Sequence, residues 1–155
     1  MRHIRHILAV LLLALAGTAH ASPWALDVNL TSYHTEQWAR DALNQSNPGL
    51  GLEYQIAPDW SAMTGFYRNS YRRTSAYALA AWTPLHVALP AGIEASAGIA
   101  AGLVGGYTRE ECPVAPLGAA GVLKLRKDGY GINLLMVPNM GSKSGFIGLQ
   151  AVISF

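Results

Sequence analysis

The chain has 155 residues, of which 51% are hydrophobic and only 13% are charged. Eleven Lys and Arg stand against nine Asp and Glu, and two of the basic residues, Arg2 and Arg5, lie at the very start. Without these two the chain is electrically balanced, which argues against a nucleic-acid partner. Its one cysteine, Cys112, excludes an internal disulfide.

The first 21 residues have the pattern of a secretory signal peptide. A basic start precedes an apolar run from Ile7 to Ala16, and the small-residue motif Ala19-His20-Ala21 follows. The apolar run is shorter than the roughly 20 residues of a membrane-spanning helix. We therefore expect cleavage after Ala21 and a single mature domain over residues 22–155.

The remaining chain consists of short segments in which apolar and smaller or polar residues alternate, separated by turn and loop signals. Alternation with period two predicts β-strands. A Pro-containing connection rather than a strand is expected over Thr83–Ala91. Eight strands are predicted, at Trp24–Tyr33, Gly49–Ile56, Trp60–Arg68, Thr74–Trp82, Gly92–Tyr107, Pro116–Leu125, Tyr130–Val137 and Gly145–Phe155.

Loop lengths and aromatic residues indicate how these strands are arranged. Short turns mostly alternate with longer polar loops, aromatic residues gather near the strand ends, and the last strand ends on Phe155. An even number of strands with these features is typical of outer-membrane proteins. The predicted fold is an eight-stranded antiparallel up-and-down transmembrane β-barrel in the outer membrane of a Gram-negative-type bacterium. The alternative, a soluble barrel or sandwich, is disfavoured by the uniformly apolar outward faces.

The inward faces predicted from this alternation differ between the two halves of the barrel. One half is polar, with Asp27, Asn29, Glu53, Gln55, Ser61, Glu94, Ser96, Lys124, Asn133, Gln150 and Ser154. The other half carries small or apolar residues, which leave volume and exclude water, so an apolar pocket open to the outer surface is expected. Its predicted lining is Gly51, Gly65, Gly98, Ala100, Gly102, Gly118, Ala120, Leu135 and Phe146.

Two candidate catalytic residues follow strands that end at the outer rim. His34 follows the first strand, and Ser70 follows the third within the stretch FYRNSYRR. A histidine can serve as base toward a serine hydroxyl in acyl transfer. The alternatives are a polar loop residue for His34 and a turn-forming residue for Ser70.

Cations surround this pair. Arginine side chains suit phosphate groups, so they predict contacts with lipid phosphates, whether or not the barrel is an enzyme. The residues concerned are Arg68, Arg72, Arg73 and Arg109. His34 and Glu36 together fall short of the three or four ligands of a usual metal site, and neither a metal nor a cofactor is expected.

From about His34 to Phe155 the chain resembles the lipid A palmitoyltransferases, the PagP family of small outer-membrane barrels. The resemblance rests on short stretches that occur in the family's order: TSYHTEQW with His34, NPGLGLEY, Arg68-Asn69-Ser70, Trp82-Thr83-Pro84-Leu85, and two prolines, Pro116 and Pro138, near the outer ends of strands. Asn69 stands where the family has its catalytic Asp. Asparagine can orient a hydroxyl or an imidazole but cannot stabilise an imidazolium by charge.

The resemblance implies transfer of an acyl chain from a phospholipid to lipid A at the outer leaflet, with the chain held in the barrel interior. In this role His34 is the base, Ser70 the nucleophile or the activated hydroxyl, and Asn69 an orienting group. The implied partners are phospholipid, lipopolysaccharide and the barrel assembly machinery, and a monomer is expected. The alternative is a non-catalytic outer-membrane barrel that binds lipid or a small apolar ligand.

Overall fold

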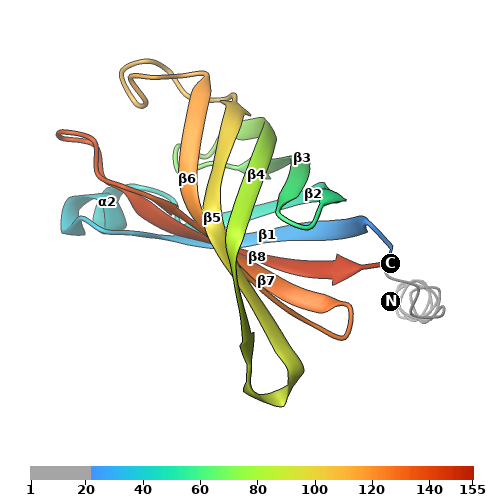
Figure 1. The fold of residues 1–155 in the computed structure, drawn as a ribbon. Coiled ribbons are helices and arrows are strands. Elements are labelled where there is room, and N and C mark those ends of the chain that lie inside the picture. The colour runs from blue at the N-terminus through green and yellow to red at the C-terminus, as the bar shows by residue number, and fades with distance from the viewer. Residues whose placement is uncertain (1–21) are drawn as a thin grey trace, which may run out of the picture.

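The computed structural model describes residues 22–155, so the expected signal peptide lies outside the described residues. The eight strands pair antiparallel in chain order, and β1 also pairs with β8, which closes the barrel (Figure 1). The predicted eight-stranded antiparallel up-and-down barrel is thereby confirmed. Its strands are β1 (Trp24–His34), β2 (Ser46–Ala57), β3 (Trp60–Arg68), β4 (Thr74–Leu89), β5 (Ile93–Val104), β6 (Leu117–Lys127), β7 (Tyr130–Val137) and β8 (Phe146–Ser154).

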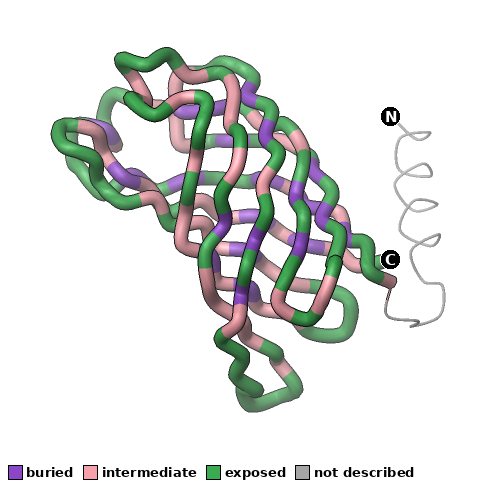
Figure 2. The backbone as a smooth tube through the Cα atoms, turned by 45° about the horizontal axis from the view of Figure 1, so that its top comes forward, coloured by how far each residue is buried: buried purple, intermediate pink, exposed green. Residues whose placement is uncertain are grey.

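Exposed and buried residues alternate along most strands (Figure 2). On β2, for example, Leu50, Leu52 and Tyr54 are exposed, whereas Gly51 and Glu53 are buried. The barrel therefore presents apolar side chains outward and encloses several charged groups, among them Glu53 and Lys124. None of the helices within residues 22–155 is long and apolar enough to cross a membrane.

Two connections differ from the prediction. The segment expected as a Pro-containing loop, Thr83–Ala91, mostly continues β4 to Leu89, and β4 and β5 then form a hairpin that projects beyond the neighbouring turns (Figure 1). Pro84 is tolerated because the β4–β5 register shifts between Trp82 and Leu85, where the ladder is interrupted. A 3₁₀ turn, Pro90–Gly92, closes the hairpin.

A short helix, α2 (Gln37–Ala42), lies in the loop between β1 and β2, where only a polar loop was expected. It has six residues, too few to show a helical period in the sequence. The end of the barrel that carries α2 and the long loops is called the loop end below, and the opposite end is called the turn end.

A polar network fills the interior toward the turn end, as predicted. The ammonium group of Lys124 contacts the Glu53 carboxylate and donates to Ser61 Oγ. Arg126 donates to Glu53 at 3.1 Å and to Asn133 at 2.7 Å. Two residues predicted to belong to this network, Gln55 and Glu94, are instead exposed. The Gln55 side chain bends onto the β2–β3 turn, where its Nε2 donates to the Ala57 carbonyl at 2.6 Å. Glu94 pairs with Ala88, in the part of β4 that extends beyond its last β3 partner, Trp82.

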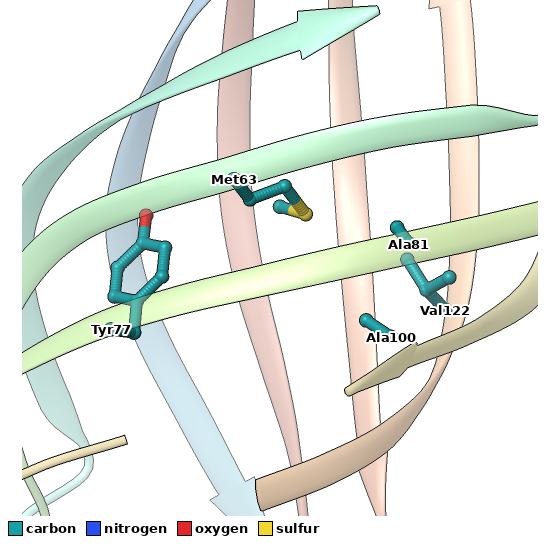
Figure 3. Packing of buried hydrophobic residues seen from close by; sticks show 5 residues of the cluster. All are labelled: Met63, Tyr77, Ala81, Ala100 and Val122. Carbon is teal, nitrogen blue, oxygen red and sulfur yellow. The ribbon is translucent and has the colours of Figure 1, made fainter. Parts of the chain in front are cut away.

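A small apolar cluster lies beside this network on its loop-end side. Met63 follows Ser61 along β3, and Val122 precedes Lys124 along β6, each two residues nearer the loop end. This cluster therefore lies between the charged side chains and the part of the barrel interior at the loop end. Its buried members are Met63, Tyr77, Ala81, Ala100 and Val122 (Figure 3).

Candidate functional site

His34 and Ser70 meet at the loop end of the barrel, although they are 36 positions apart in the chain. Ser70 Oγ lies 3.1 Å from His34 Nε2, within hydrogen-bond distance, and both side chains are buried. The structure therefore brings together the two residues that the sequence proposed as a base and a hydroxyl.

A β-bulge in β1 turns His34 into the barrel. Between Asn29 and Thr31, β1 advances two residues while its partner β8 advances only from Gln150 to Leu149. The extra residue shifts the alternation by one, so that His34 faces inward and is buried. Strict alternation from Asn29 would have directed His34 outward, and nothing in the sequence marked the bulge.

The side chain of Asn69 shapes the turn that carries Ser70. Its Oδ1 accepts hydrogen bonds from the backbone N–H groups of Tyr71 and Arg73, at 2.9 and 3.0 Å. Its Nδ2 donates to Ser75 Oγ at 3.0 Å and to the Gly106 carbonyl at 2.9 Å. Asn69 thus orients the turn rather than the imidazole of His34.

The second ring nitrogen of His34, Nδ1, is buried and has no hydrogen-bond partner among residues 22–155. For Nε2 to accept the Ser70 proton, Nδ1 must carry the ring hydrogen. The opposite tautomer would instead donate from Nε2 to Ser70 and leave the hydroxyl unactivated. The pair therefore has base–hydroxyl geometry without a third group that fixes the reactive tautomer.

A cavity of about 650 Å³ opens beneath this pair. Five of the predicted lining residues do line it, and they come from β5 to β8. Their small or apolar side chains leave room for a chain-like apolar ligand. They are Ala100, Gly118, Ala120, Leu135 and Phe146.

Four predicted lining glycines have other roles. A Cβ at Gly51 would lie 2.1 Å from the Tyr77 hydroxyl, and one at Gly65 would lie 2.8 Å from it, so these glycines make room for the tyrosine. A Cβ at Gly98 would lie 1.9 Å from the Trp82 carbonyl, and one at Gly102 would lie 2.2 Å from the Ala78 carbonyl. The prediction that these four line the pocket was wrong, because inward direction alone does not show whether space is open.

The cavity also reaches the outer wall between β6 and β7. Pairing of these strands toward the loop end stops at Gly121 and Met136, whereas β6 remains paired with β5 up to Leu117. In Figure 1, β6 and β8 diverge toward the loop end. Both the inward Gly118 and the outward Ala119 line the cavity, so this space is continuous with the barrel exterior. Pro116 and Pro138 flank the unpaired stretch.

The four rim arginines differ in their surroundings. Arg68, Arg72 and Arg109 are exposed. Arg73 forms an ion pair with Glu111 and donates to the Gly106 carbonyl at 3.0 Å, so it joins the β3–β4 loop to the β5–β6 loop. A further arginine that the sequence did not single out, Arg40 of α2, donates to the His34 carbonyl at 2.8 Å.

The loop between β5 and β6 covers one side of the site and holds ionisable groups. Burial of Glu111 raises its pKa, but hydrogen bonds from Arg73 and from the Thr108 N–H outweigh it, so the pKa lies below its usual value. Burial raises the pKa of Tyr107, whose hydroxyl lies 3.1 Å from that of Tyr67. At neutral pH Glu111 is charged and Tyr107 is not.

No group of three His, Cys, Asp or Glu that could hold a metal ion is present in the part of the chain that the structure describes. A comparison of the chain with protein-family models finds no match, and a comparison with curated proteins finds none either.

Proposed function

We propose that this barrel is an outer-membrane acyltransferase that moves an acyl chain from a phospholipid to a lipid A acceptor. The observation that carries the proposal is the buried Ser70–His34 pair, with 3.1 Å between Oγ and Nε2, at the mouth of an apolar cavity of about 650 Å³. A hydroxyl and a base at one end of a chain-sized apolar space suit an ester whose carbonyl lies at the rim and whose chain lies inside.

In the proposed reaction Ser70 Oγ attacks the donor ester while His34 Nε2 accepts its proton. The lysophospholipid oxygen leaves with that proton, and the chain is held as a serine ester. The acceptor hydroxyl then gives its proton to His34 and attacks the ester, which restores Ser70. The serine and the imidazole thus return to their starting states, and no oxidant or reductant is needed.

Two features support access by membrane lipids. The unpaired stretch between β6 and β7 connects the cavity with the exterior at the height of the apolar outer face. The exposed Arg68, Arg72 and Arg109 offer guanidinium groups to lipid phosphates at the rim. Arg73 contributes less to such contacts, because it is engaged with Glu111.

The location also belongs to this proposal. The apolar outward face, the aromatic residues at strand ends and the leader pattern of residues 1–21 suit export and insertion into an outer membrane. Insertion would require the barrel assembly machinery, and the partners would be phospholipid and lipopolysaccharide. The resemblance to the lipid A palmitoyltransferases favours the same donor and acceptor.

The experiment is transfer in vesicles that contain the purified barrel, a phospholipid donor and lipid A, with the products measured by mass spectrometry. Wild type should add one acyl chain to lipid A. Ser70→Ala and His34→Ala should each abolish the transfer, and the double variant should be no worse than either, because residues that act as a unit are non-additive. Ser142→Ala, in an exposed loop, is the control. Unmodified lipid A with folded wild type would refute the proposal.

A non-catalytic lipid-binding barrel is the second candidate, and the unpartnered Nδ1 of His34 favours it. Without a group that selects the reactive tautomer, the Ser70–His34 hydrogen bond is a structural contact at the mouth of the cavity. This alternative predicts fatty-acid binding with no acyl transfer, and Ser70→Ala should then leave the binding unchanged.

A further inference from the structure

Polar atoms without partners gather at the inner end of the cavity. Asn29 Nδ2, Tyr77 Oη and both carboxylate oxygens of Asp27 are buried and have no hydrogen-bond partner within residues 22–155. Asn29 is 9% exposed, Tyr77 5% and Asp27 0%. Buried polar groups are normally paired, so four such atoms on three neighbouring residues indicate that this place holds a hydrogen-bonding group.

The geometry joins these residues into one floor. Tyr77 extends from β4 across the interior with its hydroxyl directed toward β3 (Figure 3). That hydroxyl would lie 2.1 Å from a Cβ at Gly51, which is the β2 register partner of Asp27. Asn29 lies two residues farther along β1, and both Asn29 and Tyr77 line the cavity. The cavity therefore has apolar walls but a polar floor, with Asp27 beneath it.

The hydrogen-bonding capacity of the floor is specific. Asn29 Oδ1 already accepts a bond of 2.9 Å from Gln150 Nε2, so its amide group remains as a donor. The Tyr77 hydroxyl can both donate and accept. A group that accepts from Asn29 and also donates fits this pair, and a hydroxyl has both capacities.

The charges around the floor favour a neutral ligand group. Asp27 and Glu53 are balanced by Lys124 and Arg126, both of which contact Glu53. A carboxylate ligand would add a third anion above Asp27, and an ammonium ligand would add a third cation, held apart from Asp27 because that residue does not line the cavity. Burying such an unpaired charge is costly, whereas a hydroxyl brings no charge.

We propose that the floor is a subsite for a hydroxyl group carried on the buried part of a fatty acyl chain. The inference rests on the proposed function in one respect, because an acyl chain must enter the cavity. Between the register partners of Asn29 and His34, which are Gln150 and Phe146, the unbulged strand β8 advances four residues. The floor therefore lies about 10 Å below the rim, at about 3.3 Å per residue and a strand tilt of about 40°. The hydroxyl is therefore recognised only at one depth along the chain.

The test uses purified wild-type protein in detergent micelles and displacement of a fluorescent fatty acid. Competitors are matched pairs of unsubstituted and terminally hydroxylated fatty acids, with chains of eight to sixteen carbons. Within one narrow range of lengths the hydroxylated member should bind about three- to tenfold more tightly, the range for one net hydrogen bond. At shorter lengths its hydroxyl meets the apolar wall, and it should bind more weakly than its unsubstituted partner.

Two single-atom variants assign the effect to the floor. Tyr77→Phe removes the hydroxyl but keeps the ring. The affinity advantage of the hydroxylated fatty acid over its unsubstituted partner should then fall below twofold, while unsubstituted chains still bind. Tyr67→Phe removes a hydroxyl nearer the rim that is already bonded to Tyr107, and it should keep the advantage. If Tyr77→Phe does not fold, Asn29→Ala should show the same loss.

Two outcomes would overturn the inference, and they differ. Equal binding within every pair would mean that the floor holds only water, while the acyl cavity of the proposed function stands. Failure of every chain to bind folded protein would instead refute the proposed cavity function, and the hydroxyl subsite with it.

Discussion

The side chain of Asn69 is hydrogen-bonded to the Gly106 carbonyl over 2.9 Å, and this bond ties the turn that carries Ser70 to the loop after β5. The same amide group donates to Ser75, and the Asn69 oxygen accepts two backbone N–H groups. An asparagine fits this position because the site requires two acceptor contacts and two donor contacts from one planar group.

Asn69→Asp should therefore lower stability and activity together. The carboxylate keeps the two backbone bonds but loses both donors, and it places a negative charge against the Gly106 carbonyl. The expected cost is about 1–3 kcal/mol of unfolding free energy, measured by urea unfolding in micelles. Ser142→Asp, at an exposed loop residue, is a control for the charge. A gain in acyl transfer would show instead that a carboxylate at position 69 reaches His34.

Gly148 and Gly98 should respond in opposite ways to leucine. A Cβ at Gly148 has no neighbour closer than 3.7 Å and the residue lines the cavity, so Gly148→Leu should fold and shorten the chain that binds. At Gly98 the Cβ would meet the Trp82 carbonyl, so Gly98→Leu should cost about 1–3 kcal/mol or more, or prevent folding. Heat modifiability on gels measures folding, and fatty-acid displacement measures chain length. Equal stability of Gly148→Leu and Gly98→Leu would contradict the prediction that only Gly98 lacks room for a side chain.

Lys124 should be among the most sensitive interior positions. Lys124→Met leaves Glu53 buried with only Arg126 as cationic partner, which should cost about 3–5 kcal/mol. The matched control is Asp59→Asn, which breaks the exposed pair with His86 and should cost less than about 1 kcal/mol. Urea unfolding of both variants in the same micelles measures the two losses of unfolding free energy. Similar losses would contradict the prediction that Lys124 matters more than Asp59.

The loop held by Glu111 should loosen in acid. The folded-state pKa of Glu111 lies below its value of 4.5 in the unfolded chain, so its stabilising contribution is complete above 4.5 and is lost as pH falls through the lower, folded-state value. The Thr108 N–H donates to this carboxylate at 2.8 Å, so exchange of that amide, corrected for its intrinsic pH dependence, should accelerate. Glu111→Gln should show no such acceleration of exchange. The same acceleration in that variant would mean that another group causes it.

The sequence alone determined the barrel and much of its interior. Alternation with period two is a local property of each strand, and it placed Glu53, Lys124 and Asn133 inside together with Ala100 and Ala120. Turn signals separated the strands closely enough to give their number and their antiparallel order. The rim position of His34 and Ser70 followed from the same path of strands.

Only the tertiary structure decided how the site is built. The bulge that turns His34 inward depends on the pairing of β1 with β8, which are joined only when the barrel closes. The roles of Gly51 and Gly98 depend on Tyr77 and Trp82 of a different strand, and alternation shows direction but not the distance to the next atom. The partners of Asn69 come from two loops that meet in space. Such contacts join residues that are distant in sequence, so no local pattern contains them.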